Sequence, residues 1–356
     1  MTQISQIAVL WAAAVIDYAV GDPWSWPHPV QWMGKVITLY TQQAIALQAK
    51  RKASEQASEH GHHRRTVLAM RLAGIGLAAL LILGSAGVSW VGLWLLGQIS
   101  PWLRWGGECV LLASCFAGRS LRRAVEDVLE PMREKDLVRS RQVLAQYVGR
   151  DTDQLSEPEI YRALLETASE NAIDGVFAPL FYATVGAVFG LAGPVAIAYK
   201  AASTLDSMVG YRREPYTHLG WFSARFEDAL TWLPCRISVL TIALLSGRPG
   251  YVLKICQRDA SADPSPNAGW SECAYAAALG VQLGGENIYK GVVTVKPLLA
   301  EDTQPITTAI IYRAFALTRY SFLIGLAAGA LILFLTPPME LTEGLPLACL
   351  SRLDTL

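Results

Sequence analysis

The sequence predicts an all-α, polytopic membrane protein. Hydrophobic residues make up 52% of the 356 residues and the mean hydropathy is +0.30, which is too apolar for an ordinary soluble domain. The stretch Leu72–Leu96 carries no charge and is long enough to cross a bilayer. We therefore expect one integral membrane domain over residues 1–356, with about four to six membrane-embedded segments, some of them broken or re-entrant, plus cytoplasmic helices.

Six apolar segments support this prediction. The first has no basic n-region and no small-residue cleavage site, so we interpret it as a retained span rather than a signal peptide. The fourth is interrupted by Gly190-Leu-Ala-Gly-Pro194, which leaves two halves too short to span and predicts a re-entrant helical hairpin or a broken helix. In chain order, the segments are Ile4–Val20, Met70–Ile99, Cys109–Gly118, Phe177–Ala202, Ala229–Ser246 and Phe322–Leu335.

The basic residues predict the orientation. Residues 1–6 carry no Lys or Arg, whereas the loop after the first segment carries Lys35, Lys50, Arg51, Lys52, Arg64 and Arg65. Counting positive charges places the N-terminus outside and this loop in the cytoplasm. We also expect a cytoplasmic helical insertion over residues 119–175, with Pro158 in the first turn of its last helix, and a polar helical segment outside the bilayer over residues 247–319.

The tract Gln48–Arg65 is strongly polar. Its acidic residues and histidines are Glu55, Glu59, His60, His62 and His63. Metal binding is one interpretation, but we favour a solvated loop, because tracts of such biased composition need no fold.

The charge balance and the cysteines exclude several functions. Thirty Lys and Arg residues balance thirty Asp and Glu residues, so we expect no nucleic-acid partner. The six Cys residues form no C-x-x-C pair and no zinc spacing, and we interpret them as buried thiols in a reducing or membrane setting rather than a disulfide framework.

Glu166, Glu170 and Asp174 form the most informative cluster. They recur every four residues and would share one face of a helix that leads into an apolar segment. Like charges at this spacing repel, and a sequence accepts the repulsion most readily when a cation, or a substrate that carries one, lies between them. Ionisable groups where an apolar segment begins indicate a functional site. The alternative interpretation is a surface helix with solvated acids. Ser169 and Asn171 beside the acids, and Gly175 at the break, favour a functional site.

A second cluster follows the first apolar segment. Asp17 lies at the end of that segment, where a charge is unfavourable unless it is paired. Asp22 precedes a proline, and His28 is held between two prolines in an extended loop from which it can reach a ligand. The alternative is a rigid membrane-exit turn whose Trp residues lie in the interface belt.

A third cluster follows the broken segment. Lys200, Thr204 and Ser207 fall at i, i+4 and i+7 on one helical face, and a Lys with hydroxyls on the following turns can hold phosphate oxygens. Asp206 points elsewhere and is expected to take a metal or an amine. The alternative is a snorkelling lysine near an ordinary helix end at Gly210.

A fourth cluster precedes an Ala-rich helix that runs to Leu279. Pro264 and Pro266 force an extended approach to this helix. Gly269 as the N-cap with Glu272 at N3 would leave free N–H groups that bind an anion. The alternative is a well-capped helix and nothing more.

Together these stretches resemble the adenosylcobinamide-phosphate synthase family, the membrane enzymes of cobalamin biosynthesis. The sequence departs from the family pattern at Ser203, at Arg213-Glu-Pro215, at Asp263 and at Gln282. The resembling stretches are Gly21-Asp-Pro with Pro-His28-Pro-Val, Glu170-Asn with Asp174-Gly and Ala-Pro-Leu-Phe-Tyr182, Tyr199-Lys-Ala with Thr-Leu-Asp-Ser-Met-Val-Gly-Tyr211, Pro264-Ser-Pro-Asn-Ala-Gly-Trp270, and Leu283-Gly-Gly-Glu-Asn-Ile-Tyr289.

The resemblance implies an ATP-dependent ligation. A propionate carboxylate of adenosylcobyric acid, a corrinoid, is joined to the amine of (R)-1-amino-2-propanol phosphate or ethanolamine phosphate. An acyl phosphate that an amine attacks requires Mg²⁺, phosphate clamps and a base. We expect Glu166, Glu170 and Asp174 to bind metal or amine; Lys200, Thr204, Ser207 and Arg212 to clamp phosphate; Asp22 and His28 to orient the ligand or shuttle a proton; and Asp206, Asn171, Tyr211, Ser265 and Asn267 to complete the site.

Two other classes of function stay open. Broken apolar segments with charges at their ends are also typical of a transporter for a charged small molecule, and a third possibility is a non-catalytic membrane scaffold for other corrin enzymes. For the ligase we expect a multi-pass protein of the inner membrane with its active site in the cytoplasm. Its partners would be membrane lipid and other late enzymes of cobalamin biosynthesis.

Overall fold

The structure, a computed structural model, describes residues 2–21, 28–55, 62–211 and 213–336. These residues form fourteen α-helices and one β-hairpin. The helices are α1 (Gln3–Ala19), α2 (Pro29–Glu55), α3 (His62–Ile99), α4 (Pro101–Ala113), α5 (Gly118–Arg133), α6 (Leu137–Leu144), α7 (Glu157–Ala172), α8 (Ala178–Val188), α9 (Ala192–Val209), α10 (Tyr216–Leu219), α11 (Trp221–Leu245), α12 (Pro249–Asp259), α13 (Ala268–Leu279) and α14 (Thr308–Leu335). A π-helical turn (Ile173–Phe177) joins α7 to α8, a 3-10 turn (Ala260–Ala262) follows α12, and the strands are β1 (Leu283–Tyr289) and β2 (Val292–Leu299).

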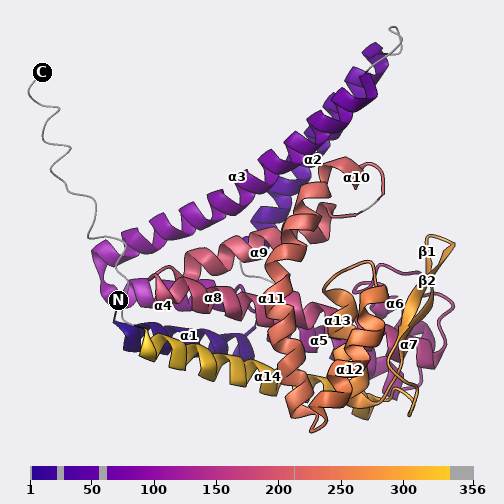
Figure 1. Ribbon diagram of the computed structural model, residues 1–356. Helices are drawn as coiled ribbons and strands as arrows, with labels where there is room; N and C mark the ends of the chain where they lie inside the picture. Colours follow the sequence, from indigo (N-terminus) through magenta and orange to yellow (C-terminus); the bar gives the residue numbers. More distant parts are fainter. Residues whose placement is uncertain (1, 22–27, 56–61, 212, 337–356) are drawn as a thin grey trace, which may run out of the picture.

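The chain is an all-α polytopic membrane protein, as predicted. Four helical stretches are long and apolar enough to cross a membrane, namely Thr66–Ile99, Glu157–Val188, Trp221–Leu245 and Thr308–Leu335. Helix α1 is apolar but shorter, with 17 residues. In Figure 1 the start of α1, the α3–α4 connection and the end of α14 lie together on the left, while α5–α7, α12, α13 and the hairpin lie on the right. Helix α11 runs across the direction of α8 and α14 between these two parts.

The predicted break in the fourth apolar segment is confirmed. Helices α8 and α9 pack against each other and are separated by residues 189–191. Gly190 has φ +70, a left-handed conformation that favours glycine. A Cβ on Gly186 would lie 2.6 Å from the carbonyl oxygen of Leu191, so the turn is too tight for a side chain at this position.

Several elements differ from the prediction. The loop expected after the first segment is largely the long helix α2, and α3 resumes at His62, so a solvated loop over Gln48–Arg65 is wrong for residues 48–55 and 62–65. Residues 56–61 lie outside the described part of the chain. Helix α11 begins at Trp221, earlier than the expected Ala229, and α14 begins at Thr308 rather than Phe322.

The β-hairpin was not among the predicted elements. Its two-residue turn has positive φ at both Lys290 (52°) and Gly291 (78°), which is the geometry of a type I′ turn. Both amides donate hydrogen bonds to the carboxylate of Asp151, at 3.0 and 2.7 Å. The β-branched run Val292-Val-Thr-Val295 after a Lys-Gly pair was the sequence signal for this element.

Two hydrophobic cores divide the molecule. The first joins α5, α7, α12, α13 and the hairpin and includes Ile160, Leu164 and Tyr275. The second joins the apolar helices α1, α3, α4, α8 and α9 and includes Leu10 and Leu112. The rod formed by α7, the π-turn and α8 passes from one core to the other, because Ile173 and Phe177 belong to the first core and Leu180 and Ala183 to the second.

Gly74 is expected to be essential where α3 meets α10. A Cβ at this position would lie 1.9 Å from the carbonyl oxygen of Leu219, a backbone atom that cannot move independently. We predict that Gly74→Ala lowers stability by roughly 1–3 kcal/mol, the usual range for overpacking, measured as a lower midpoint of thermal unfolding in detergent.

Gly84, on the same helix, provides the matched control, because no atom lies within 4 Å of a Cβ built there. Gly84→Ala should be neutral or stabilise the helix by roughly 0.5–1 kcal/mol. Equal unfolding midpoints for the two variants would contradict the close contact between α3 and α10.

Candidate functional site

Two cavities of opposite character meet at Asp174 and Asp206. The first, which we call the basic chamber, has a volume of 660 Å³ and is lined by Arg119, Arg123 and Lys200. The second, which we call the acidic chamber, has a volume of 630 Å³. Its carboxylates are those of Glu170, Asp174, Asp206, Glu227, Asp228 and Asp263, and Lys296 also lines it. Because Asp174 and Asp206 line both chambers, they form the wall that the chambers share.

The rod of α7 and the π-turn positions Asp174. Helix α7 begins with a capping box between Ser156 and Glu159, and Pro158 lies in its first turn as predicted. Asp174 lies inside the π-turn, a rare local structure that is frequent at functional sites. The carbonyl oxygen of Gly175 accepts a hydrogen bond from the amide of Ala117 at 2.7 Å, which ties the turn to the start of α5.

Helix α9 supplies the polar face that the sequence predicts. Lys200, Thr204 and Ser207 all line the basic chamber. The hydroxyl of Thr204 donates to the carbonyl oxygen of Lys200 at 2.7 Å, and that of Ser207 donates to the carbonyl oxygen of Thr204 at 2.9 Å. Since both protons are used within the helix, the positive groups that face this chamber are those of Lys200 and the two arginines rather than the hydroxyls.

Asp206 lies at the end of the same helix and does not point away from the site. Its Oδ1 atom is buried, with no hydrogen-bond partner in the described part of the chain. A Cβ on Gly210 would lie 1.9 Å from this atom. Gly210 is therefore more than an ordinary helix end, because its lack of a side chain makes room for the carboxylate.

Helix α11 contributes two acids that the sequence interpretation missed. Glu227 is buried and accepts hydrogen bonds from the hydroxyls of Tyr199, at 3.4 Å, and Thr231. Asp228 follows it at the wall of the acidic chamber. The predicted segment began at Ala229 and so left both acids outside. Adjacent acids within an apolar helix were the signal that could have found them.

The loop of residues 263–267, which contains Pro264 and Pro266 and which we call the proline loop, lines the acidic chamber, but the start of the helix that follows it differs from the prediction. Helix α13 begins at Ala268 with Asn267 as its N-cap, so Gly269 is not the N-cap and Glu272 is not at N3. The hydroxyl oxygen of Ser265 accepts from the amides of Asn267 at 3.3 Å and Ala268 at 3.1 Å. Two of the amides at this helix start, those of Asn267 and Ala268, are therefore already occupied, and an anion site there stays a prediction.

Asn267 joins this loop to α11. Its Nδ2 donates to the carbonyl oxygen of Asp228 at 2.8 Å, and its Oδ1 is buried without a partner among the described residues. Arg236 of α11 donates to the carbonyl oxygen of Pro266 at 2.8 Å and stacks on the ring of Trp270 at 4.3 Å. These contacts fix the loop against the helix that carries Glu227 and Asp228.

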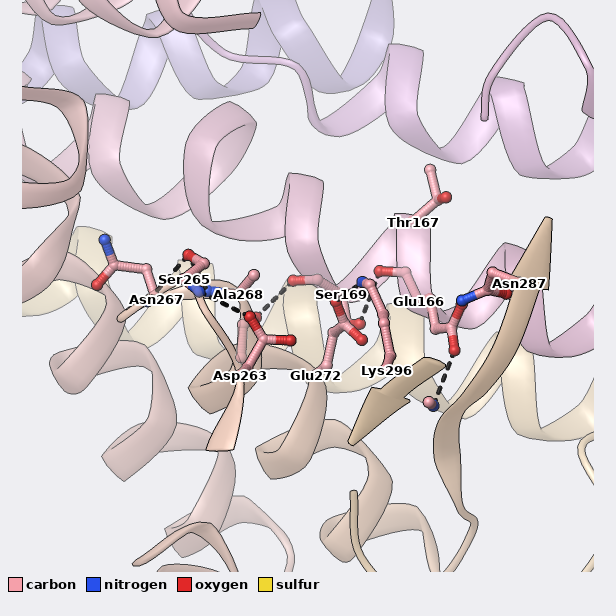
Figure 2. A network of polar contacts seen from close by, with 12 residues as sticks. Glu166, Thr167, Ser169, Asp263, Ser265, Asn267, Ala268, Glu272, Asn287 and Lys296 are labelled. Carbon is pink, nitrogen blue, oxygen red and sulfur yellow. Dashed lines mark hydrogen bonds and ion pairs between the residues drawn. The ribbon is translucent and has the colours of Figure 1, made fainter. Parts of the chain in front are cut away.

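Glu166 does not line either chamber. It is 1% exposed and forms ion pairs with Arg150 and, at 3.6 Å, with Arg162. Its second oxygen accepts from the amide of Gly284 at 2.9 Å, so the carboxylate holds the base of the hairpin against α7 (Figure 2). The expectation that Glu166 binds a metal is corrected by this arrangement, in which its oxygens already have cationic and amide partners.

Lys296 of β2 extends this network into the acidic chamber. Its Nζ lies 3.3 Å from Oε1 of Glu272, which is fully buried on α13, and Figure 2 shows the pair between Asp263 and Glu166. Burial lowers the pKa of Lys296, but Glu272 and the neighbouring carboxylates raise it more, so its pKa lies above the ordinary value. Burial raises the pKa of Glu272 to about 8 despite the attraction of Lys296.

The remaining predicted residues lie in different places. Asn171 and His28 line the basic chamber, and the side-chain amide of Asn171 donates to the carbonyl oxygen of Thr167 at 2.8 Å. Tyr211 lines neither chamber; it is 46% exposed and its ring lies against Arg213. Asp22 and Arg212 lie outside the described residues.

The acidic chamber offers oxygen donors but no complete set of metal ligands among the described residues. Among the described residues, no three His, Cys, Asp or Glu side chains are close enough to form a complete ligand set. Mg²⁺ usually keeps several waters and needs only one or two carboxylates together with substrate phosphates. The unpartnered oxygens of Asp206 and Asn267, with Asp174 and Glu170 in the same chamber, are a donor set of this kind.

Glu272 is expected to make stability depend on pH. Its pKa in the folded protein, about 8, lies above the ordinary value of 4.5. Between these two pH values Glu272 keeps its proton in the folded state and has lost it in the unfolded state. Its contribution to stability is therefore complete below the ordinary pKa and is lost as pH rises through the folded pKa. We predict that Glu272→Gln flattens this fall, measured as unfolding midpoints from about pH 5 to about pH 9.

Lys296, Glu170, Glu166 and Asp263 surround Glu272 and remain in the variant. The same slope in wild type and Glu272→Gln would assign the pH dependence to those groups instead. Glu286→Gln is the control, because this glutamate lies on the exposed side of β1 and should leave the slope unchanged.

The chain is similar to known proteins over most of its length. A family described as CobD/Cbib protein matches residues 10–318. The cobalamin biosynthesis protein CobD of Synechocystis sp. is 48% identical over 92% of this chain and 92% of its own length. CbiB of Salmonella arizonae is 40% identical over 86% of this chain and 91% of its own, and CobD of Photorhabdus laumondii is 40% identical over 84% and 89%. No solved structure matches the chain.

Proposed function

The chain belongs to the CobD/CbiB family of cobalamin biosynthesis proteins, and from this premise we propose that it is an adenosylcobinamide-phosphate synthase. The proposed reaction joins a propionate carboxylate of adenosylcobyric acid to the amine of (R)-1-amino-2-propanol phosphate or ethanolamine phosphate, with ATP consumed. The observation that supports it most is the pair of chambers of opposite charge that share Asp174 and Asp206. Such a ligation brings together phosphate groups, which need cations, and an amine, which needs an acceptor for its proton.

The basic chamber is proposed to hold the phosphates. The cationic groups of Lys200, Arg119 and Arg123 line it, and guanidinium groups bind phosphate oxygens in a bidentate manner while lysine acts as a point charge. In the proposed route a carboxylate oxygen of the corrinoid attacks the γ-phosphorus of ATP, ADP leaves, and an acyl phosphate forms. Positioning and charge compensation account for most of the catalysis of such transfers.

The shared wall is proposed to carry the proton transfer. The amine nitrogen attacks the acyl carbon, phosphate leaves, and nitrogen gives up one proton, for which Asp174 and Asp206 offer carboxylate oxygens on both sides. The acids of the other chamber attract the ammonium form of the amino alcohol before it reacts. Mg²⁺, held through water by Asp174, Asp206 and Glu170, would supply charge compensation for the phosphates.

The position of the site supports a cytoplasmic location. Both chambers are lined by residues of α7, α9 and the π-turn, and the acidic chamber also by the proline loop and the hairpin. In Figure 1 the side that carries α5–α7, α12, α13 and the hairpin has the longer connections, such as residues 145–156 between α6 and α7, whereas the α3–α4 and α8–α9 connections are short. We therefore propose that this side faces the cytoplasm of a multi-pass inner-membrane protein, where ATP and the corrinoid are found. A complex with other late cobalamin enzymes remains a prediction.

The test is a ligation assay with purified protein in detergent. The protein is incubated with adenosylcobyric acid, aminopropanol phosphate, ATP and Mg²⁺, with ethanolamine phosphate in a parallel reaction, and the amide is detected by mass spectrometry. We expect amide product that requires ATP. Folded protein that forms no amide with either amine, and instead moves substrate across sealed vesicles, would establish transport; neither product nor flux would favour a scaffold.

A further inference from the structure

A third cavity lies between α1, α5 and α14, and the proposed reaction uses only two of its arginines, Arg119 and Arg123, which also line the basic chamber. We call it the arginine cavity. It has a volume of 710 Å³ and is lined by Arg119, Arg122, Arg123 and Arg319. Two carboxylates, those of Asp17 and Glu126, also line it. The cations outnumber the acids, so the cavity favours an anionic ligand.

Three of the four arginines come from one face of α5. Arg119, Arg122 and Arg123 fall at i, i+3 and i+4, which places them next to one another on the helix surface. Arg119 is held in place by a hydrogen bond of 2.8 Å to the carbonyl oxygen of Tyr18 at the end of α1. A Cβ on Gly21, just after α1, would lie 2.5 Å from the Arg119 side chain. The lack of a side chain at Gly21 therefore leaves room for Arg119.

Arg122 and Arg319 have few competing interactions. Arg122 makes an ion pair of 3.8 Å with Glu126, but its side chain is 52% exposed, so the pair is weak. Glu126 is also engaged by Arg133 at 3.3 Å and by the hydroxyl of Tyr312 at 2.9 Å. Arg319 lies over the ring of Tyr320 and hydrogen-bonds to its hydroxyl at 3.4 Å. Neither Arg122 nor Arg319 lines the basic or the acidic chamber.

The walls of the arginine cavity are apolar and belong to membrane helices. Phe315 and Phe322 come from α14, Ala14 from α1, and Val176 from the π-turn. Arg319 directly precedes the apolar stretch of α14 that ends at Leu335. The cations thus lie beside a helix that is long and apolar enough to cross a membrane, next to a wall that accepts an apolar chain.

We propose that the arginine cavity binds a phosphate ester that carries an apolar part. Guanidinium groups match the geometry of phosphate oxygens, and basic pockets between membrane helices bind anionic lipid head groups. The ligand chemistry is the same for an anionic phospholipid of the surrounding leaflet and for a phosphorylated molecule from solution. This inference does not depend on the proposed reaction, because its test measures binding alone.

The test compares wild type with Arg122→Gln, Arg319→Gln and the double variant, after lipid has been removed in detergent. Binding of phosphatidylglycerol, phosphatidylcholine, ATP and inorganic phosphate is measured by native mass spectrometry and by titration. Loss of one charge-assisted contact should weaken binding roughly tenfold or more. Arg139→Gln is the matched control, because Arg139 is similarly exposed and ion-paired, to Glu134 at 3.5 Å, but lines none of these cavities.

Each outcome has a definite meaning. Weaker binding of phosphatidylglycerol in both single variants, with phosphatidylcholine bound weakly throughout, supports a lipid head group as the ligand. Weaker binding of ATP or phosphate, with lipid unaffected, supports a ligand from solution. The proposal is wrong if the Arg122 and Arg319 variants have the wild-type unfolding midpoint and bind all four probes as tightly as the Arg139→Gln control does.

Discussion

Asp174→Asn and Lys200→Ala are each expected to lower the rate of amide formation by roughly 10²-fold or more, the range for loss of an acid–base group or of a preorganised charge. Asp174 lies in the wall between the two chambers, where it faces both the cationic groups and the other acids. Lys200 is the cation that α9 presents to the basic chamber. The rate is measured as ATP-dependent amide product with saturating and with limiting substrate, so that kcat and KM are separated.

Asp302→Asn is the control for these variants, because Asp302 is exposed and lines neither chamber. It should retain wild-type activity. If Asp174→Asn is folded and forms amide at the wild-type rate, the proton acceptor must be another carboxylate, with Asp206 the first to test. If Lys200→Ala changes neither kcat nor the KM for ATP or amino alcohol phosphate, the basic chamber is not the phosphate site.

Glu166→Ala is expected to have the largest effect on stability. The carboxylate is buried with two arginines, at 1% exposure for Glu166 and 8% for Arg150, and removal of one partner leaves buried positive charge without compensation. Breaking a buried ion pair in this way costs about 3–5 kcal/mol. The change should appear as a much lower unfolding midpoint in detergent and as early proteolysis of the hairpin that Glu166 holds through the amide of Gly284.

Glu134→Ala tests the same kind of pair at the surface. Its partner Arg139 lies at 3.5 Å and both side chains are more than half exposed, so the loss should be within about 1 kcal/mol. A Glu166→Ala protein as stable as Glu134→Ala would show that the buried network is not needed. If Glu166→Ala loses little stability but needs a higher Mg²⁺ concentration for half-maximal activity, Glu166 is a metal ligand after all.

The sequence predicted the features that depend on local patterning. The glycines and the proline after Val188 broke the apolar run, and the structure has the turn at Gly190 there. The spacing of Lys200, Thr204 and Ser207 placed them on one face, and all three line one chamber. Glu170 and Asp174 were recognised because acids are rare at the start of an apolar segment, and both line the acidic chamber.

The missed features depend on contacts between distant parts of the chain. Glu166 has the same spacing as Glu170 and Asp174, but Arg150 and the hairpin amide, which no local pattern connects to it, take it out of the chamber. Lys296 is brought to Glu272 only by the pairing of β1 with β2. Arg119 and Arg123 were interpreted as part of a charged cytoplasmic helix, because sequence alone does not show that α1 packs against this helix and that α9 lines the same chamber.

The shared wall of Asp174 and Asp206 has a thermodynamic consequence. A cation that enters the acidic chamber compensates these carboxylates, and the same carboxylates repel any phosphate in the basic chamber. Occupancy of one chamber therefore raises affinity in the other, and this cooperativity must be reciprocal and equal in both directions. In the proposed reaction, phosphate would therefore bind more weakly to a protein whose acidic chamber holds no cation.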